Sequence, residues 1–98
     1  MTVSVKEKEG VATLCLEEDM TIFTAAALKK ALLESLESLP ELVLDLSGVA
    51  EMDTAGFQLL VLARREAAAA GKGFRVAAGS PAVEAVFEVY AMKDLVGR

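Results

Sequence analysis

The chain has 98 residues, of which 54% are hydrophobic, and its formal net charge is -5. This length corresponds to one domain, and so much apolar content excludes a disordered chain. The negative charge argues against nucleic acid as a partner, because a phosphate-binding surface needs clustered lysine and arginine. There is no histidine and a single cysteine, Cys15, so the commonest metal ligands and an intrachain disulfide are absent. We expect no metal and no cofactor.

The sequence also argues against a membrane protein. No apolar run approaches the roughly 18 residues that a membrane-spanning helix needs. Near the start, Val3 and Val5 alternate with polar or charged residues, which is not the pattern of a signal peptide. We therefore expect a single domain over residues 1–98 that is cytoplasmic and has no direct membrane insertion.

The first predicted elements are two strands. Residues 2–8 alternate between apolar and polar side chains, and Glu9-Gly10 is a turn signal. Residues 11–16 predict a second strand with two fairly apolar faces, as in a strand that is covered on both sides. Cys15 lies in this strand and is expected to be a small core residue.

A helix is predicted next, from about Phe23 to Glu37. Thr21 or Thr24 could cap its start, and Pro40 ends it because the residue before a proline resists helical geometry. Helical spacing predicts an inward stripe formed by Leu28, Leu32, Ser35, Leu36 and Leu39.

The next two elements are a strand and a long helix. Residues 41–46 lack strict alternation, which is typical of a buried parallel strand. The helix runs from Asp53 to about Ala70 and is closed by Gly71 as a C-terminal cap.

The last elements are a strand over residues 74–78 and a third helix. Ser80-Pro81 is typical of a helix start, because a capping hydroxyl is followed by proline at the first helical position. The apolar positions of this helix are Val83, Val86, Phe87 and Tyr90. A short final element is expected around Leu95-Val96.

The order of elements is strand, strand, helix, strand, helix, strand, helix. Such alternation indicates an α/β fold with a mostly parallel sheet and right-handed crossovers. The first two strands are expected to pair antiparallel through the turn at Gly10.

Asp53-Thr54 is the strongest candidate site. The Asp53 carboxylate can accept hydrogen bonds from the free amides of the first helical turn, and Thr54 then occupies the first helical position. Phosphorylation of Thr54 would add nearly two negative charges, which a helix start tolerates. A partner surface complementary to a neutral hydroxyl would not tolerate them, and Glu51 and Asp53 are already acidic. The alternative interpretation is a plain N-cap followed by an ordinary exposed threonine.

Two neighbouring features extend this candidate site. Gly56 lies in the first turn, where glycine costs about 1 kcal/mol relative to alanine, so it indicates either close packing or the approach of a partner backbone. Ala55 fits both alternatives. A second patch, residues 17–23, follows a strand and precedes a helix, so it should lie at the same end of the sheet as Asp53. Met20 or Ile22 could be exposed there, or both could be buried.

No enzymatic activity is expected. Catalysis needs convergent groups of matched pKa, whereas the carboxylates here are scattered along the chain. No glycine-rich phosphate loop is present, because Gly71-Lys72-Gly73 is too short and precedes a strand rather than a helix.

Three segments resemble blocks of the STAS domain family, in the right order and at matching spacing. Residues 16–28 resemble its strand end, acidic loop and Phe-Thr-Ala helix start. Residues 45–56, which end in Asp-Thr-Ala-Gly, resemble its second block, and residues 80–83 resemble its Ser-Pro-x-Val motif. The resemblance implies an α/β, STAS (SpoIIaa-like) fold. This fold has a four- to five-stranded, mostly parallel sheet with three to four helices packed on one face.

The resemblance also implies a function in protein binding. STAS anti-sigma factor antagonists bind an anti-sigma factor, a kinase of the histidine-kinase ATPase superfamily, which frees the sigma factor. The kinase then phosphorylates the antagonist and inactivates it. Thr54 matches the phosphorylated position, and Asp19 matches an acidic residue of the binding loop. The residues expected to contact a partner are Asp19, Met20, Thr21, Asp53, Thr54, Ala55, Gly56 and Phe57.

The chain departs from the antagonist pattern in ways that keep other functions open. Antagonists usually carry Ser-Ser or Ser-Thr after the aspartate, whereas this chain has Thr54-Ala55, and Glu18 stands where many members have glycine. Residues 53–56 are also similar to the STAS subunit of the lipid-asymmetry ABC transporter, where the threonine matters for binding the ATPase, and to STAS proteins of chemotaxis-type signalling. A sensor of nucleotides or other small molecules that uses the same helix start is a further alternative.

Overall fold

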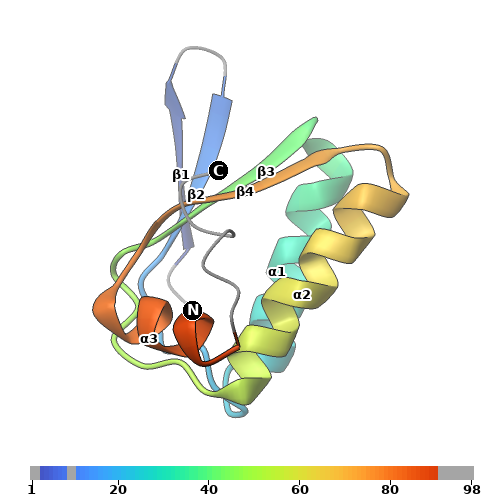
Figure 1. The fold of residues 1–98 in the computed structure, drawn as a ribbon. Coiled ribbons are helices and arrows are strands. Elements are labelled where there is room, and N and C mark those ends of the chain that lie inside the picture. Colours follow the sequence, from blue (N-terminus) through green and yellow to red (C-terminus); the bar gives the residue numbers. More distant parts are fainter. Residues whose placement is uncertain (1–2, 9–10, 91–98) are drawn as a thin grey trace.

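The computed structural model describes residues 3–8 and 11–90, and these form a four-stranded sheet in the order β1-β2-β3-β4 (Figure 1). The first strand, β1 (Val3–Lys8), pairs antiparallel with β2 (Val11–Leu16). The other two, β3 (Glu41–Leu46) and β4 (Gly73–Gly79), continue the sheet in parallel. The predicted α/β fold with a mostly parallel sheet is confirmed.

Three helices are found in the described residues: α1 (Ala25–Ser38), α2 (Thr54–Ala69) and α3 (Pro81–Val89). Figure 1 shows α1 and α2 side by side on one face of the sheet, with α3 beside the start of α2. The predicted turn at residues 9–10 and the short element near residues 95–96 lie outside the described residues. Within residues 3–8 and 11–90, no helix combines the length and the apolar content needed to cross a membrane.

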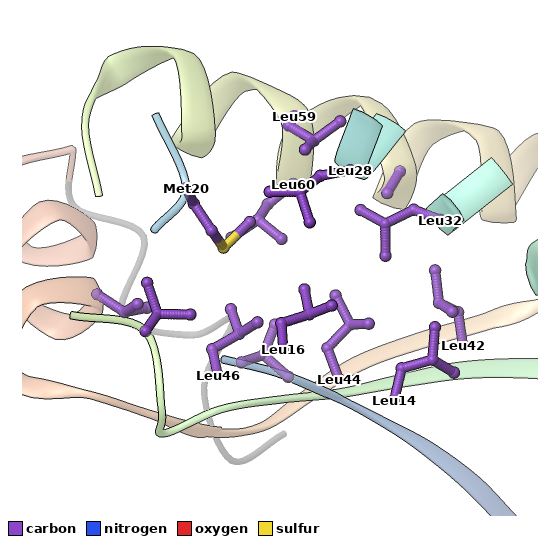
Figure 2. Packing of buried hydrophobic residues seen from close by; sticks show 14 of the residues in the cluster. Leu14, Leu16, Met20, Leu28, Leu32, Leu42, Leu44, Leu46, Leu59 and Leu60 are labelled. Carbon is purple, nitrogen blue, oxygen red and sulfur yellow. The ribbon is translucent and has the colours of Figure 1, made fainter. Parts of the chain in front are cut away.

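The core lies between the sheet and the two long helices. Figure 2 shows leucines of the strands facing leucines of the helices across this space. Each buried leucine contributes about 2 kcal/mol, so this layer fixes α1 and α2 on the sheet. Cys15 is also buried, as predicted. The leucines that are at most 1% exposed are Leu14, Leu16, Leu28, Leu32, Leu42, Leu44, Leu46 and Leu60.

Local sequence chemistry accounts for the helix ends. The Ser80 hydroxyl accepts a hydrogen bond from the Val83 amide at 3.2 Å, and Pro81 occupies the first position of α3. Gly71 follows α2 with a φ of 70°, in the left-handed region that glycine adopts without strain. Both ends agree with the predictions from the sequence.

The start of α1 differs from the prediction. The helix begins at Ala25, because the Thr21 carbonyl accepts the amides of both Thr24 and Ala25 and holds residues 21–24 in a turn. Thr24 occupies the N-cap position, but its hydroxyl makes no capping hydrogen bond to the helix. Phe23, which was assigned to the helix, therefore lies in the loop before it.

Candidate functional site

Two loops join where β2 and β3 end, as the sequence predicted. The β2–α1 loop covers residues 17–24, and the β3–α2 loop covers residues 47–53. The Met20 amide donates to the Glu51 carbonyl at 2.9 Å, and the Asp53 amide donates to the Met20 carbonyl at 3.1 Å. Met20 and Met52 thereby form a parallel β-bridge. The two candidate patches are one continuous surface, fixed by backbone hydrogen bonds.

Asp53 connects this surface to the start of α2. One carboxylate oxygen, Oδ1, accepts the Gly56 amide at 3.1 Å and so caps the helix. The other oxygen, Oδ2, accepts the Ile22 amide from the β2–α1 loop at 3.0 Å. These two bonds, to Ile22 and then Gly56, lower the pKa of Asp53 from its ordinary value, because both favour the charged carboxylate. Asp53 is thus an N-cap and also the residue that positions the neighbouring loop.

Thr54 occupies the first position of α2, and its side chain is exposed. Its hydroxyl oxygen lies 2.9 Å from the hydroxyl oxygen of Tyr90, and the two groups share a hydrogen bond. The Tyr90 ring stacks on Phe57 with ring centroids 4.5 Å apart. No sequence pattern indicates this contact, since helical spacing places Tyr90 only in the apolar stripe of the third helix. No local pattern relates the end of α3 to the start of α2.

Gly56 is required by close packing inside the site. A Cβ atom at this position would lie 2.1 Å from the Met20 carbonyl oxygen, which is far closer than atoms can approach. Of the two alternatives left open for Gly56, the structure selects packing. The contact is with the backbone of the β2–α1 loop, and it brings this loop against α2.

Three of the residues expected to contact a partner, Met20, Gly56 and Phe57, are buried. Met20 is fully buried, and Figure 2 shows its side chain reaching between Leu60 on the helix side and Leu46 on the strand side. Phe57 is 5% exposed, and it lies on the same face of α2 as the fully buried Leu60, three positions later. These side chains are not available on the surface, and they support the site from inside. Ala55 is half-buried beside them.

The exposed apolar groups of the site lie in the β2–α1 loop. Phe23 is 94% exposed and Ile22 is 70% exposed, so Ile22 rather than Met20 is the exposed residue of that pair. The Thr24 hydroxyl donates to the Asp19 carbonyl at 2.6 Å and accepts the Thr21 amide at 3.0 Å. Thr24 therefore holds the loop in a shape that presents Ile22 and Phe23 outward. Phe23 belongs to the predicted second patch, residues 17–23, but it is not among the residues expected to contact a partner.

A shallow hollow of about 630 Å³ lies beside Phe23 and Asp53. The charged groups among its described lining residues are all carboxylates, from Asp19, Glu51 and Asp53. An acidic hollow repels phosphate groups and attracts a basic surface. The site is therefore better suited to a protein surface with lysine or arginine than to a nucleotide. The described lining residues are Asp19, Thr21, Phe23, Thr24, Ala50, Glu51, Met52, Asp53 and Ala82.

Comparisons with solved structures identify the same fold in anti-sigma factor antagonists. A Thermotoga maritima protein described as an anti-sigma factor antagonist is 21% identical, with a TM-score of 0.81, over 96% of this chain and 82% of that chain. An anti-sigma factor antagonist from Mycobacterium paratuberculosis is 28% identical, with a TM-score of 0.80, over 95% and 80% of the two chains. Unphosphorylated SpoIIAA is 13% identical, with a TM-score of 0.77, over 97% and 85%.

The family comparison covers almost the whole sequence. No curated protein matches the chain. The family model described as "Mlab, STAS domain" matches residues 3–97, which include both loops and all three helices described above. The chain therefore belongs to the STAS domain family.

Proposed function

We propose that this protein is a non-enzymatic regulator of the anti-sigma factor antagonist type, which binds a kinase-like anti-sigma factor and is switched by phosphorylation at Thr54. One observation carries the proposal. The exposed Thr54 hydroxyl adjoins a loop with an exposed apolar pair, Ile22 and Phe23, and Asp53 holds the loop and the helix start together. A partner can therefore contact an apolar anchor and the switch residue at once.

The electrostatics of the site support a charge switch. Asp19, Glu51 and Asp53 make the rim acidic, which favours a basic partner surface. Phosphorylation at Thr54 would add nearly two further negative charges at the first position of α2. The helix dipole favours an anion at this end, so the fold would tolerate the phosphate. A contact surface shaped around a neutral hydroxyl would lose its fit, so binding would be lost while the domain stays folded.

Different residues of the site support folding and partner binding. The residues that fix the two loops, Met20 and Gly56, are buried, whereas Thr54 and Phe23 are exposed and carry little of the core. A change at Thr54 should therefore leave the fold intact. This is the physical requirement for a domain that alternates between a binding and a non-binding state.

The experiment is affinity capture from a lysate of the source cell, with the full chain as bait. We expect wild type to retain an ATP-binding kinase, Thr54→Glu to lose it at least tenfold, and Thr54→Ser, which keeps the hydroxyl, to retain it. The captured kinase should transfer the γ-phosphoryl group of ATP to Thr54, with release of ADP and loss of the hydroxyl proton. A Thr54→Glu protein that retains the kinase as well as wild type does would contradict the proposal.

A second candidate function is docking on the ATPase subunit of a lipid-transport ABC transporter. The name of the matching family model, "Mlab, STAS domain", and the similarity of residues 53–56 to that transporter subunit favour it. In this case the same capture experiment should yield an ABC ATPase, and no phosphoryl transfer to Thr54 should occur. Thr54 would then be a docking residue whose neutral hydroxyl contacts the ATPase.

A further inference from the structure

The Thr54 hydroxyl already has a partner within the molecule. Its oxygen lies 2.9 Å from the hydroxyl oxygen of Tyr90, a residue 36 positions further along the chain. Tyr90 is the C-cap residue of α3, and its amide donates to the Val86 carbonyl at 3.2 Å. The candidate switch residue is therefore connected directly to the last turn of a different helix.

Stacking between aromatic rings determines where the Tyr90 hydroxyl points. The Tyr90 ring lies almost parallel to the Phe57 ring, with an interplanar angle of 13°, and Phe57 meets Phe87 edge to face at 5.9 Å. Phe57 and Phe87 are at most 5% exposed, so the core fixes them. Tyr90 is 41% exposed and rests on this fixed pair. Among the residues that the structure describes, the stack on Phe57 and the hydrogen bond to Thr54 are the two interactions that hold its side chain in this position.

A change at Thr54 removes one of these two interactions. A hydroxyl offers one proton and two acceptor positions, and the bond to Tyr90 uses one of them. A phosphoryl group on this oxygen replaces the proton and places a bulky dianion beside the phenol. Phosphorylated Thr54 can no longer donate to the Tyr90 hydroxyl oxygen, and the dianion crowds the position 2.9 Å from Oγ1 that the phenol now occupies.

We propose that the position of Tyr90 depends on the state of Thr54. The unmodified Thr54 hydroxyl holds the Tyr90 phenol by a hydrogen bond, and replacement of this hydroxyl releases Tyr90 and loosens the last turn of α3. This inference rests on the proposed role of Thr54 as the switch residue, and it extends the switch from a local charge to a second helix. A partner that contacts the end of α3 would then sense the state of Thr54 without touching it.

The chain contains its own probe for this coupling. Tyr90 is the only tyrosine and there is no tryptophan, so the intrinsic emission of the protein under tyrosine excitation arises from position 90. Acrylamide quenching of this emission measures how open the ring is to solvent. Amide hydrogen exchange at Tyr90 measures how often the last turn of α3 opens.

The experiment uses the isolated full chain and three substitutions at one exposed position. Thr54→Val keeps the shape and removes the hydroxyl, Thr54→Glu introduces a negative charge, and Thr54→Ser keeps the hydroxyl as the matched control. We expect exchange of the Tyr90 amide to rise about two- to fivefold in the valine and glutamate variants, which corresponds to losing one hydrogen bond of ordinary net strength. Quenching should rise in the same two variants, and the serine variant should match wild type.

Tyr90→Phe provides an independent arm, because it keeps the ring stack and removes only the hydroxyl. Exchange at position 90 should rise as in Thr54→Val, and the double variant should add nothing further, since both changes remove the same bond. Wild-type exchange and quenching in Thr54→Val would overturn the inference and leave the proposed partner binding standing. Unaltered kinase capture by Thr54→Glu would contradict the proposed function and leave the measured coupling between Thr54 and Tyr90 in place.

Discussion

The two ends of α2 are held in opposite ways. At its start, Gly56 is in contact with the Met20 backbone, and the Asp53 carboxylate accepts amides from both the helix and the neighbouring loop. At its other end, Gly71 has no atom close enough to meet an added Cβ. There the Lys72 ammonium group donates to the carbonyls of Leu36 and Glu37 at the end of α1. The start of α2 is therefore joined to the neighbouring loop by a backbone contact and the short Asp53 side chain, whereas one long lysine side chain joins its end to α1.

The start of α2 has to be positioned more accurately than its end. The helix start presents Thr54 and positions the Ile22–Phe23 pair, so a shift of the loop would separate Thr54 from its apolar neighbours. The helix end only has to close a turn and satisfy carbonyl groups, which a flexible lysine can do over a range of positions. Substitutions of similar size should therefore cost more at the start of α2 than at its end.

The largest effect is expected from Gly56→Ala. Alanine is the better helix residue by about 1 kcal/mol, but its Cβ would lie 2.1 Å from the Met20 carbonyl oxygen. Overlap of this kind outweighs the helix preference, and we expect a net loss of about 2 kcal/mol in the free energy of unfolding. The measurement is urea denaturation followed by circular dichroism.

Gly71→Ala is the matched control at the other end of the same helix. Its φ of 70° makes alanine unfavourable by about 1 kcal/mol, but no atom lies in the way of the added Cβ. Equal losses of stability in Gly71→Ala and Gly56→Ala, or wild-type stability in Gly56→Ala, would contradict the expected difference between the two helix ends.

A smaller effect, confined to a range of pH, is expected from Asp53→Asn. The hydrogen bonds from Ile22 and Gly56 lower the pKa of Asp53 below its ordinary value of 3.8. A lowered pKa in the folded state stabilises the protein above pH 3.8, and this stabilisation is lost as the pH falls through the folded-state pKa. Wild type should therefore exceed Asp53→Asn in stability most clearly near neutral pH, and the difference should shrink in acid.

The measurement is urea denaturation of both proteins from neutral to acidic pH. Asp45 needs a parallel variant, Asp45→Asn, because hydrogen bonds from the Ser47 hydroxyl and amide also lower the pKa of Asp45. Asp45 lies in β3 and holds no part of the β2–α1 loop, so its variant should change acid stability without disturbing Ile22. A constant difference between wild type and Asp53→Asn at every pH would show that the carboxylate charge has no such role.

Local chemistry made much of the fold predictable from the sequence. As helix caps, Asp53, Ser80 and Gly71 act on residues within a few positions of themselves, so short patterns were enough to place three helix ends. The order of the elements followed from hydrophobic periodicity in the same way. The parallel arrangement of the strands then predicted that the loop around Asp19 and the start of α2 would meet. The backbone hydrogen bonds of Met20 with Glu51 and Asp53 confirm this prediction.

The contacts that depend on three-dimensional packing could not be predicted. The direction of the Met20 side chain is set by its bridge to Met52, and no pattern within residues 17–23 contains that information. The sequence pattern places Phe23 at the start of the helix, whereas in the structure the turn at residues 21–24 places it before α1. The Thr54–Tyr90 bond joins two helix ends that are adjacent only because α3 packs through Phe87 onto Phe57.

The smallest effect on stability, and the clearest separation of folding from binding, is expected from Phe23→Ala. Its side chain is 94% exposed, so we expect the free energy of unfolding to change by less than about 0.5 kcal/mol. Exposed aromatic side chains are typical binding anchors, so under the proposed function the truncation of Phe23 should weaken partner capture about tenfold. Val5→Ala is the control, because Val5 is 57% exposed but lies in β1, away from both loops. Equal capture by Phe23→Ala and Val5→Ala would remove Phe23 from the binding surface, and a large loss of stability in Phe23→Ala would show that the outer layer of this site also supports the fold.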